Sequence, residues 1–194
     1  MGSGYFRFPT IHDETIIFVC EDDLWTVSVS GGVARRLTSN LGEVSHPYLS
    51  PDGEHVAFVG REEGHAEIYV MSAEGGKAKR LTFMGGTVVT TAGWTKDNQI
   101  IFVNNAEHWY LRSTFLYTVD LDGNSPIKLD YGPARSIDFG PQGGILLGRN
   151  HDDPARWKRY RGGTTGQIWI DLDGNGEINR IISDLKTNLT SPMW

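Results

Sequence analysis

The hydrophobic positions of this chain fall in short runs that are rich in β-branched and aromatic residues. Examples are Thr15–Val19, His55–Val59 and Ile100–Val103, each too short for a typical helix. Paired glycines separate many of these runs, as at Gly31–Gly32 and Gly75–Gly76. Short strands bounded by regular turn signals predict an all-β sandwich, barrel or propeller.

An internal repeat decides among these all-β folds. In four places an aromatic residue precedes a basic residue by eleven positions: Trp25 and Arg36, Tyr69 and Arg80, Tyr117 and Lys128, Trp169 and Arg180. A glycine-containing turn lies between the two residues of each pair. Because turn length fixes strand register, equal spacing predicts one β-hairpin built four times.

Two further strands precede each predicted hairpin. The nearer of the two is centred on Phe18, Phe58, Phe102 or Leu146. The distance from this strand to the aromatic residue of the hairpin grows along the chain, from seven residues in the first unit to 23 in the fourth. Insertions confined to one connection are expected when those loops gather on one face of a repeat protein.

We therefore predict an all-β fold, namely a β-propeller of four-stranded antiparallel blades. The expected blades are residues 5–40, 41–85, 86–132 and 133–186, within a single propeller segment of residues 1–194. Residues 187–194 resemble the lead into the first strand of the second unit. They are expected to form the first strand of a fifth blade, which indicates a fragment of a larger propeller. Closure of four blades into a ring stays an open alternative.

Composition narrows the function classes. The 194 residues carry a formal net charge of −6 at pH 7, which argues against a nucleic-acid binder or a polybasic membrane module. No apolar run approaches the roughly 20 residues of a membrane-spanning helix. The single cysteine, Cys20, cannot form an internal disulfide, which fits a reducing compartment.

One turn resembles half of a calcium-binding loop. Asp171, Asp173, Asn175 and Gly176 fit the first half of the pattern, but the twelfth position, which needs a bidentate carboxylate, is Ile182. The same residues occupy the repeated hairpin turn, so turn chemistry is the favoured interpretation. The six histidines show no metal-ligand spacing. No metal or other cofactor is expected.

The chain has one cluster of basic and aromatic residues. Its candidate peptide- or partner-binding residues are Arg149, Arg156, Lys158, Arg159 and Arg161, interleaved with Trp157 and Tyr160. Such groups could clamp a carboxylate or stack on a flat partner. A purely structural loop tied to neighbouring acids is the favoured alternative, and binding of an anion or nucleic acid is the weakest one. No catalytic residue is predicted.

The repeat resembles the TolB-like propeller repeat, on Leu49–Gly53, Ile68–Met71 and Arg80–Thr82. Three further stretches are similar to the N-terminal propeller of tricorn-type serine peptidases: Phe18–Trp25, Leu37–Gly42 and Trp157–Thr164. This resemblance covers nearly the whole chain. It implies a six-bladed propeller at the start of a large, oligomeric, cytoplasmic peptidase.

The resemblance also implies a function. The family's catalytic Ser and His lie beyond Trp194, so the chain alone is expected to be inactive while it positions or gates peptides. A basic pair that the family uses to hold a peptide carboxylate has no counterpart in Gly85–Val89. The alternative is a free-standing TolB-like binding or scaffold module.

The expected partners are peptides and other domains or subunits of the parent protease, with no nucleic acid and no membrane. An open array of blades leaves a sheet face and strand edges uncovered. We therefore expect a homo-oligomer or a strand-swapped association.

Overall fold

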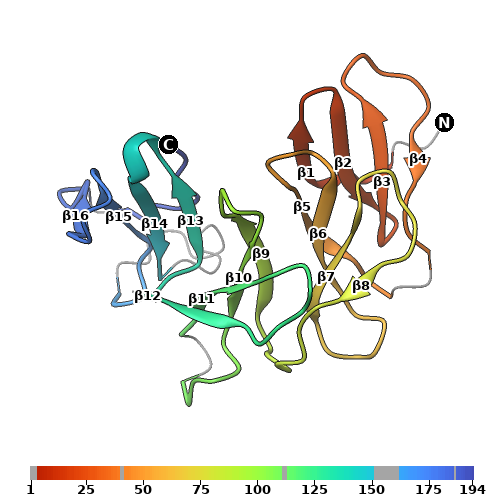
Figure 1. Ribbon diagram of the computed structural model, residues 1–194. Helices are drawn as coiled ribbons and strands as arrows, with labels where there is room; N and C mark the ends of the chain where they lie inside the picture. Colours follow the sequence, from red (N-terminus) through yellow and green to blue (C-terminus); the bar gives the residue numbers. More distant parts are fainter. Residues whose placement is uncertain (1–3, 40–41, 111–112, 151–161, 186) are drawn as a thin grey trace.

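A computed structural model describes residues 4–39, 42–110, 113–150, 162–185 and 187–194 (Figure 1). The first sheet contains β1 (Arg7–His12), β2 (Thr15–Cys20), β3 (Asp23–Ser28) and β4 (Arg35–Arg36). The second contains β5 (Ser45–Leu49), β6 (His55–Gly60), β7 (Glu67–Ser72) and β8 (Lys79–Arg80). The third contains β9 (Val89–Trp94), β10 (Ile100–Asn104), β11 (Phe115–Val119) and β12 (Ile127–Pro133). The fourth contains β13 (Ser136–Phe139), β14 (Ile145–Arg149), β15 (Gln167–Asp171) and β16 (Asn179–Ile181).

Helical structure in the described residues is limited to one short 3-10 turn, η1 (Pro141–Gly143). No helix in this part of the chain is long and apolar enough to cross a membrane. Each of the four sheets is a meander, in which every strand pairs antiparallel with the next strand along the chain. The prediction of four-stranded antiparallel blades is confirmed.

The eleven-residue spacing corresponds to the register in which the third and fourth strands of each blade pair. In every blade the aromatic residue lies opposite the basic residue: Trp25 and Arg36, Tyr69 and Arg80, Tyr117 and Lys128, Trp169 and Arg180. On its other side the aromatic residue lies opposite Phe18, Phe58, Phe102 or Leu147. The choice of Leu146 for the fourth blade was therefore wrong by one residue. Because side chains alternate between the two faces of a strand, Leu146 points to the opposite face from Leu147.

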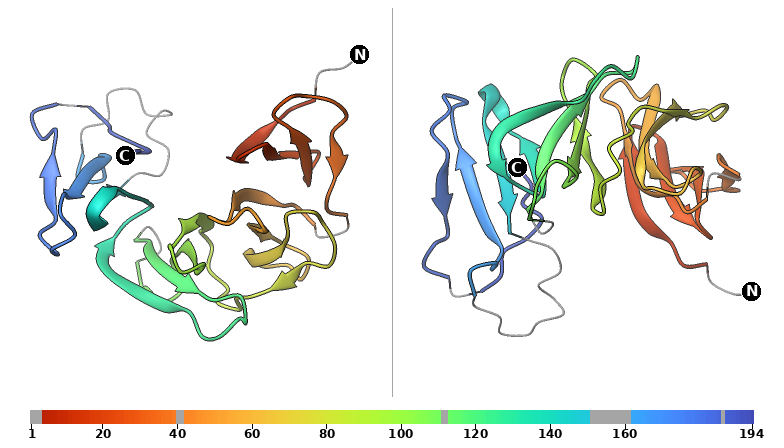
Figure 2. Two further views of the ribbon diagram at one scale, coloured as in Figure 1. Left: turned by 45° about the horizontal axis from the view of Figure 1, so that its top comes forward. Right: turned by 90° about the horizontal axis from the view of Figure 1, so that it is seen from below.

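The four sheets follow one another around a common axis (Figure 2). Contacts between blades join the first strand of each sheet to the first strand of the next, from β1 to β5, β5 to β9 and β9 to β13. The sheets form an arc, and the first and fourth blades stand at its two ends. The arrangement is that of a β-propeller with four complete blades.

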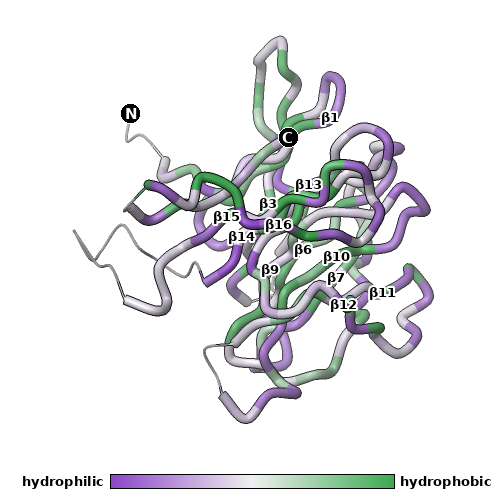
Figure 3. Tube along the Cα trace, turned by 90° about the vertical axis from the view of Figure 1, so that its left-hand side faces the viewer, coloured by the Kyte–Doolittle hydropathy of each residue, from purple (hydrophilic) through white to green (hydrophobic). Residues whose placement is uncertain are grey.

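Apolar side chains fill the three spaces between neighbouring blades. Phe58 and Tyr69 face the first blade and pack with Ile17, Val19 and Leu24. From the other face of the same sheet, a second set packs against the third blade: Ala57, Val59, Ile68 and Val70. A third cluster joins the third and fourth blades. The hydropathy-coloured trace shows hydrophobic stretches along the strands and mostly polar outer loops (Figure 3).

The innermost strands share an unusual backbone feature. Phe8 and His46, each followed by proline, have φ values of 49°, and both lie where the pairing of their strand shifts register. Ser191, which precedes Pro192, has φ 48°. Positive φ is uncommon outside glycine, so three such residues in X-Pro pairs identify equivalent positions. Although no strand is assigned to residues 187–194, they begin a fifth repeat.

Candidate functional site

Only Arg149 of the five predicted binding residues lies in the described part of the chain. Arg156, Lys158, Arg159 and Arg161 lie outside the described residues. Arg149 ends β14 and pairs with Gln167 at the start of β15. The predicted basic cluster therefore begins where β14 ends, beside the start of β15.

The Arg149 side chain is engaged with its surroundings. Its guanidinium carbon lies 4.6 Å from the centroid of the Trp169 ring, and Nη2 donates a hydrogen bond of 2.7 Å to the Tyr131 carbonyl. Burial lowers the pKa of Arg149 from its usual value. Because Tyr131 belongs to β12, this contact ties the fourth blade to the third. Within the described residues, Arg149 acts as a link between blades.

A second group of functional candidates, which is not among the residues predicted from the sequence, lies on the first strands of three blades, β1, β5 and β13. The Phe8 and His46 rings lie 4.1 Å apart between centroids and tilt by 32°. Tyr48 from the second blade is 44% exposed. Burial raises the pKa of Tyr48, and the charge of Asp138 from the fourth blade adds to the effect. The Phe8–His46 contact thus joins the first and second blades, and the charge of Asp138 reaches Tyr48 from the fourth blade. The X-Pro pairs of the inner strands were the available signal.

The charge state of this axial group follows from its burial. Burial, followed by the positive charge of Arg7, lowers the pKa of His46 to about 4. His46 is therefore neutral at pH 7. Asp138 accepts a hydrogen bond of 2.6 Å from the backbone N–H of Trp194. The axial surface presents an aromatic ring, a phenol, a neutral imidazole and a carboxylate, a mixture suited to polar and apolar contacts with an extended chain.

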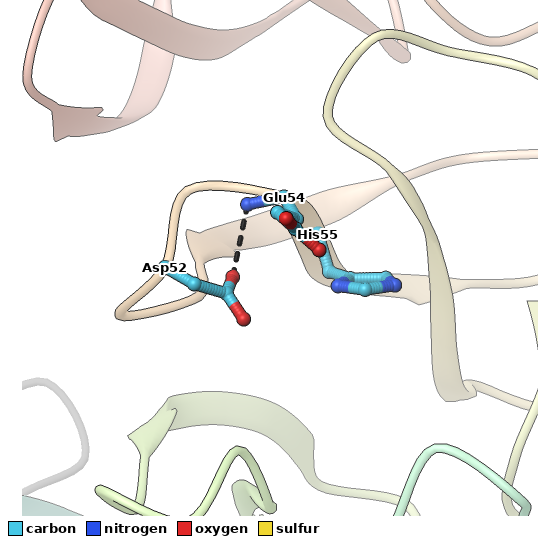
Figure 4. A group of neighbouring side chains, drawn as sticks. All are labelled: Asp52, Glu54 and His55. Atoms are coloured by element: carbon cyan, nitrogen blue, oxygen red, sulfur yellow. Dashed lines mark hydrogen bonds between the residues drawn. The ribbon is translucent and has the colours of Figure 1, made fainter.

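Three potential metal-ligating residues lie close together on the turn between β5 and β6 (Figure 4). Ligand atoms of Asp52, Glu54 and His55 lie within 4.8 Å of one another. Asp52 already accepts hydrogen bonds from Ser50 Oγ at 2.5 Å and from the Glu54 backbone N–H at 2.9 Å. The Ser50 bond is the main reason why the pKa of Asp52 is lowered. The carboxylate of Asp52 stabilises the turn.

The calcium-like turn has the same chemistry. Asp171 is buried and accepts hydrogen bonds from the backbone N–H groups of Asn175 at 3.2 Å and Gly176 at 2.7 Å. Asp120 plays the equivalent part in the third blade, where Gly123 and Asn124 donate to it. The first carboxylate of the calcium-like pattern thus binds turn amides in the structure.

Comparison with known proteins gives a consistent result. A family model described as the tricorn protease N-terminal beta propeller domain matches residues 3–194. Tricorn protease homolog 1 of Streptomyces coelicolor is 38% identical over 191 residues, which cover 98% of this chain and 18% of the relative. The crystal structure of the tricorn protease superposes with a TM-score of 0.86 at 34% identity, covering 97% of this chain and 19% of that one.

A more distant solved structure shares the fold alone. The crystal structure of TolB from Acinetobacter baumannii has a TM-score of 0.69 at 20% identity, covering 92% of this chain and 43% of that one. The chain spans about a fifth of the length of the tricorn-type proteins that it matches.

Proposed function

Because this chain belongs to the tricorn protease N-terminal β-propeller family, we propose that it is the non-catalytic propeller segment of a tricorn-like cytoplasmic serine peptidase. In this role it positions or gates peptides and contributes to assembly with other domains or subunits of that protease. The observation that carries the proposal is the match of the family model to residues 3–194, which spans all four blades.

Two surfaces support a role in handling peptides. The axial group of Phe8, His46, Tyr48 and Asp138 combines aromatic and polar side chains, as peptide-binding surfaces commonly do. The basic segment that follows Arg149 supplies positive charge suited to a peptide carboxylate. The peptide is proposed to pass along the axis, with its carboxylate held by the basic segment.

Peptide binding by the purified chain tests the axial surface. We expect fluorescein-labelled peptides of mixed sequence to bind, and Tyr48→Ala to weaken binding by at least about tenfold. Phe139→Ala is the matched control, because Phe139 is 43% exposed and points to the opposite side of its strand from Asp138. Equal affinity of Tyr48→Ala and the unaltered chain would remove the axial surface from the proposal.

Peptides with a free carboxylate or a C-terminal amide test the basic segment. We expect the free acid to bind more tightly. Replacing Arg156, Lys158, Arg159 and Arg161 together by serine should abolish that preference while leaving binding of the amide unchanged. An unaltered preference would assign the cluster to a purely structural role.

Turnover tests the non-catalytic assignment. The purified chain is expected to release no product from fluorogenic peptides. Sustained hydrolysis that copurifies with the chain and scales with its concentration would contradict that part of the proposal. Binding of a folded protein without any binding of peptides would instead favour the TolB-like scaffold.

A further inference from the structure

An arginine and a histidine meet at the junction between the first and second blades. Arg7 begins β1 and His46 lies on β5, and these two strands are in contact. The Phe8 ring lies close to both side chains. Its centroid is 4.1 Å from that of the His46 ring and 6.0 Å from the Arg7 guanidinium carbon. Both blades have all four strands in the described structure, so this junction does not depend on any further blade.

Two nitrogen atoms at this junction are buried without a partner. Arg7 Nε and His46 Nδ1 are shielded from solvent, and neither has a hydrogen-bond partner among the described residues. Leaving a buried polar group unpaired costs free energy, and folded proteins pair the great majority of such groups. Two unpaired nitrogens on neighbouring blades therefore indicate a site that a ligand completes.

The backbone is strained at the same place. Phe8 and His46 both have φ values of 49°. Residues other than glycine rarely adopt this conformation, and strained residues of this kind cluster at ligand-binding sites. The His46 carbonyl also accepts a hydrogen bond from Thr91 Oγ1 of the third blade. Contacts with both neighbouring blades thus fix the position of His46.

The charges around the two side chains favour a negatively charged ligand. Arg7 Nη2 donates a hydrogen bond of 2.9 Å to Asp22 Oδ1. A guanidinium group has five N–H donors, so this bond leaves others for a ligand. The Arg7 side chain is 27% exposed, which gives a ligand access to it. Burial and the charge of Arg7 both disfavour the protonated form of His46, whereas Asp138 acts on Tyr48.

A carboxylate has the complementary chemistry. It accepts charge-assisted hydrogen bonds from a guanidinium group, and its charge favours a protonated imidazole beside it. With a carboxylate bound, two positive groups, Arg7 and protonated His46, would face two negative ones, Asp22 and the ligand. The unpaired nitrogens and the charge balance thus point to the same class of ligand.

We propose that Arg7 and His46 bind the carboxylate of an acidic side chain in a peptide held on the axial surface. The exposed Phe8 ring contacts the aliphatic carbons of that side chain. This inference rests on the proposed function and names the class of peptide that the axial surface prefers. His46 takes up a proton from solvent when the carboxylate binds. Affinity is therefore expected to rise as the pH falls, until the ligand carboxylate is itself protonated near about pH 4.

Three short peptides test the site in the full 194-residue chain. The first is Ala-Glu-Ala with an acetylated N-terminus and an amidated C-terminus, and the second is its glutamine counterpart. The third is acetylated Ala-Ala-Ala with a free C-terminal carboxylate. NMR titration of the His46 ring should show that the glutamate peptide raises the His46 pKa from about 4 and that the glutamine peptide does not. The glutamate peptide should also bind at least about threefold more tightly at pH 5 than at pH 7.

Variants of the two side chains locate the effect. Arg7→Gln should weaken binding of the glutamate peptide by at least about tenfold and leave the glutamine peptide unchanged, while Arg7→Lys should restore part of the loss. Arg61→Gln is the matched control, because it removes the same charge from a 47% exposed side chain that lies 3.7 Å from Glu43. His46→Gln should remove the pH dependence. It also provides a second disruption if Arg7→Gln unfolds, as judged by circular dichroism.

Each outcome decides the proposal. Equal binding of the glutamate and glutamine peptides would overturn it and leave the proposed function standing. Loss of all peptide binding would defeat the proposed function and this inference together. A glutamate preference that both Arg7→Gln and His46→Gln leave intact would place the carboxylate elsewhere. An equal effect of the Ala-Ala-Ala acid on the His46 pKa would assign the site to the peptide C-terminus and overturn the preference for acidic side chains.

Discussion

Hydrogen bonds from a basic side chain on the last strand of one blade to a backbone carbonyl of the next blade link the first two junctions. The third junction, between the third and fourth blades, has a different link. Arg35 on β4 donates a hydrogen bond of 2.8 Å to the Glu74 carbonyl of the second blade. Lys79, at the same register position on β8, donates to the Leu121 carbonyl of the third blade, also at 2.8 Å. The equivalent residue of the third blade is Ile127, which is 63% exposed and has no such donor.

The third junction uses a contact in the reverse direction. Arg149 of the fourth blade reaches back to the Tyr131 carbonyl on β12. The apolar clusters between blades exist at all three junctions, so the repeat specifies the packing. The polar links are added separately, and cations at unrelated positions can supply them. The difference predicts that the fourth blade depends on Arg149 as the earlier blades depend on Arg35 and Lys79.

The blades also differ in how they hold the repeated basic residue. In the second blade Glu67 is fully buried and accepts hydrogen bonds from Thr82 Oγ1 at 2.5 Å and the Gly85 backbone N–H at 2.7 Å, with Arg80 3.6 Å away. In the third blade Phe115 occupies the position of Glu67, and Lys128 Nζ lies 3.6 Å from its ring centroid. The repeated basic residue therefore lies near a carboxylate in the second blade and against the face of an aromatic ring in the third.

The largest effect is expected at Glu67. Glu67→Ala leaves Thr82, Arg80 and the Gly85 N–H without their shared acceptor, which should cost about 3–5 kcal/mol of the unfolding free energy. Gln167→Ala at the equivalent position of the fourth blade removes one hydrogen bond, from Trp169 Nε1 at 3.1 Å, and should cost about 1 kcal/mol. Urea unfolding measures both. Equal losses would show that the two blades do not differ in this respect.

The next effect is a pH dependence located at the first junction. His46 stacks on Phe8 of the first blade, and its pKa is about 4 in the folded chain against 6.5 for a free histidine. Below pH 6.5 the unfolded chain gains a proton on His46 that the folded chain does not take up until about pH 4. The unfolding free energy is therefore unaffected by His46 above pH 6.5 and falls as the pH drops from 6.5 towards 4. The loss amounts to as much as about 3 kcal/mol.

A His46→Gln variant isolates this histidine from the carboxylates, whose titration also affects stability in acid. The unfolding free energy of the unaltered chain should fall more steeply between pH 6.5 and pH 4 than that of the variant. Identical slopes would contradict the assignment. Hydrogen-exchange protection factors, which correct for the pH dependence of intrinsic amide exchange, should be lower in β1 and β5 at pH 5 than at pH 7, with those of β13 and β14 unaffected.

A moderate effect is expected at the third junction. Arg149→Ala removes the link to Tyr131 and the contact with Trp169, which should cost about 1–3 kcal/mol. Hydrogen exchange should accelerate in β13 to β16 and stay unchanged in the first two blades. Arg35→Ala is the comparison variant, because it should have its effect at the first junction. Uniform acceleration throughout the chain in Arg149→Ala would contradict a local link.

The smallest effect is a gain. Ile127→Lys introduces a donor at the position where Lys79 serves the second junction, and it removes an exposed apolar side chain. We expect stabilisation by about 0.5–1 kcal/mol, measured as a higher urea midpoint. Ile127→Gln introduces a donor that is shorter than lysine and uncharged, so it should stabilise the chain less than Ile127→Lys. A lower midpoint for Ile127→Lys would show that the fourth blade offers no accepting carbonyl within reach.

Much of the candidate site could not be predicted from the sequence. The cluster of basic residues was visible, but Arg149 stacks on a tryptophan and binds a backbone carbonyl of another blade. The axial group of Phe8, His46, Tyr48 and Asp138 is separated by up to 130 residues in the chain. Only the arrangement of blades around an axis brings such positions together, and no local spacing records it.

The fold itself was determined by local pattern. An aromatic and a basic residue eleven positions apart specify a hairpin, because strand register and turn length are local properties. Where a 17-residue connection, residues 150–166, separated the strands, the pattern predicted Leu146, and the pairing with Trp169 showed that the position belongs to Leu147. The contacts from Arg35 to Glu74 and from Lys79 to Leu121 were likewise decided by tertiary structure. They join residues about 40 positions apart, whose proximity depends on how one sheet stacks on the next.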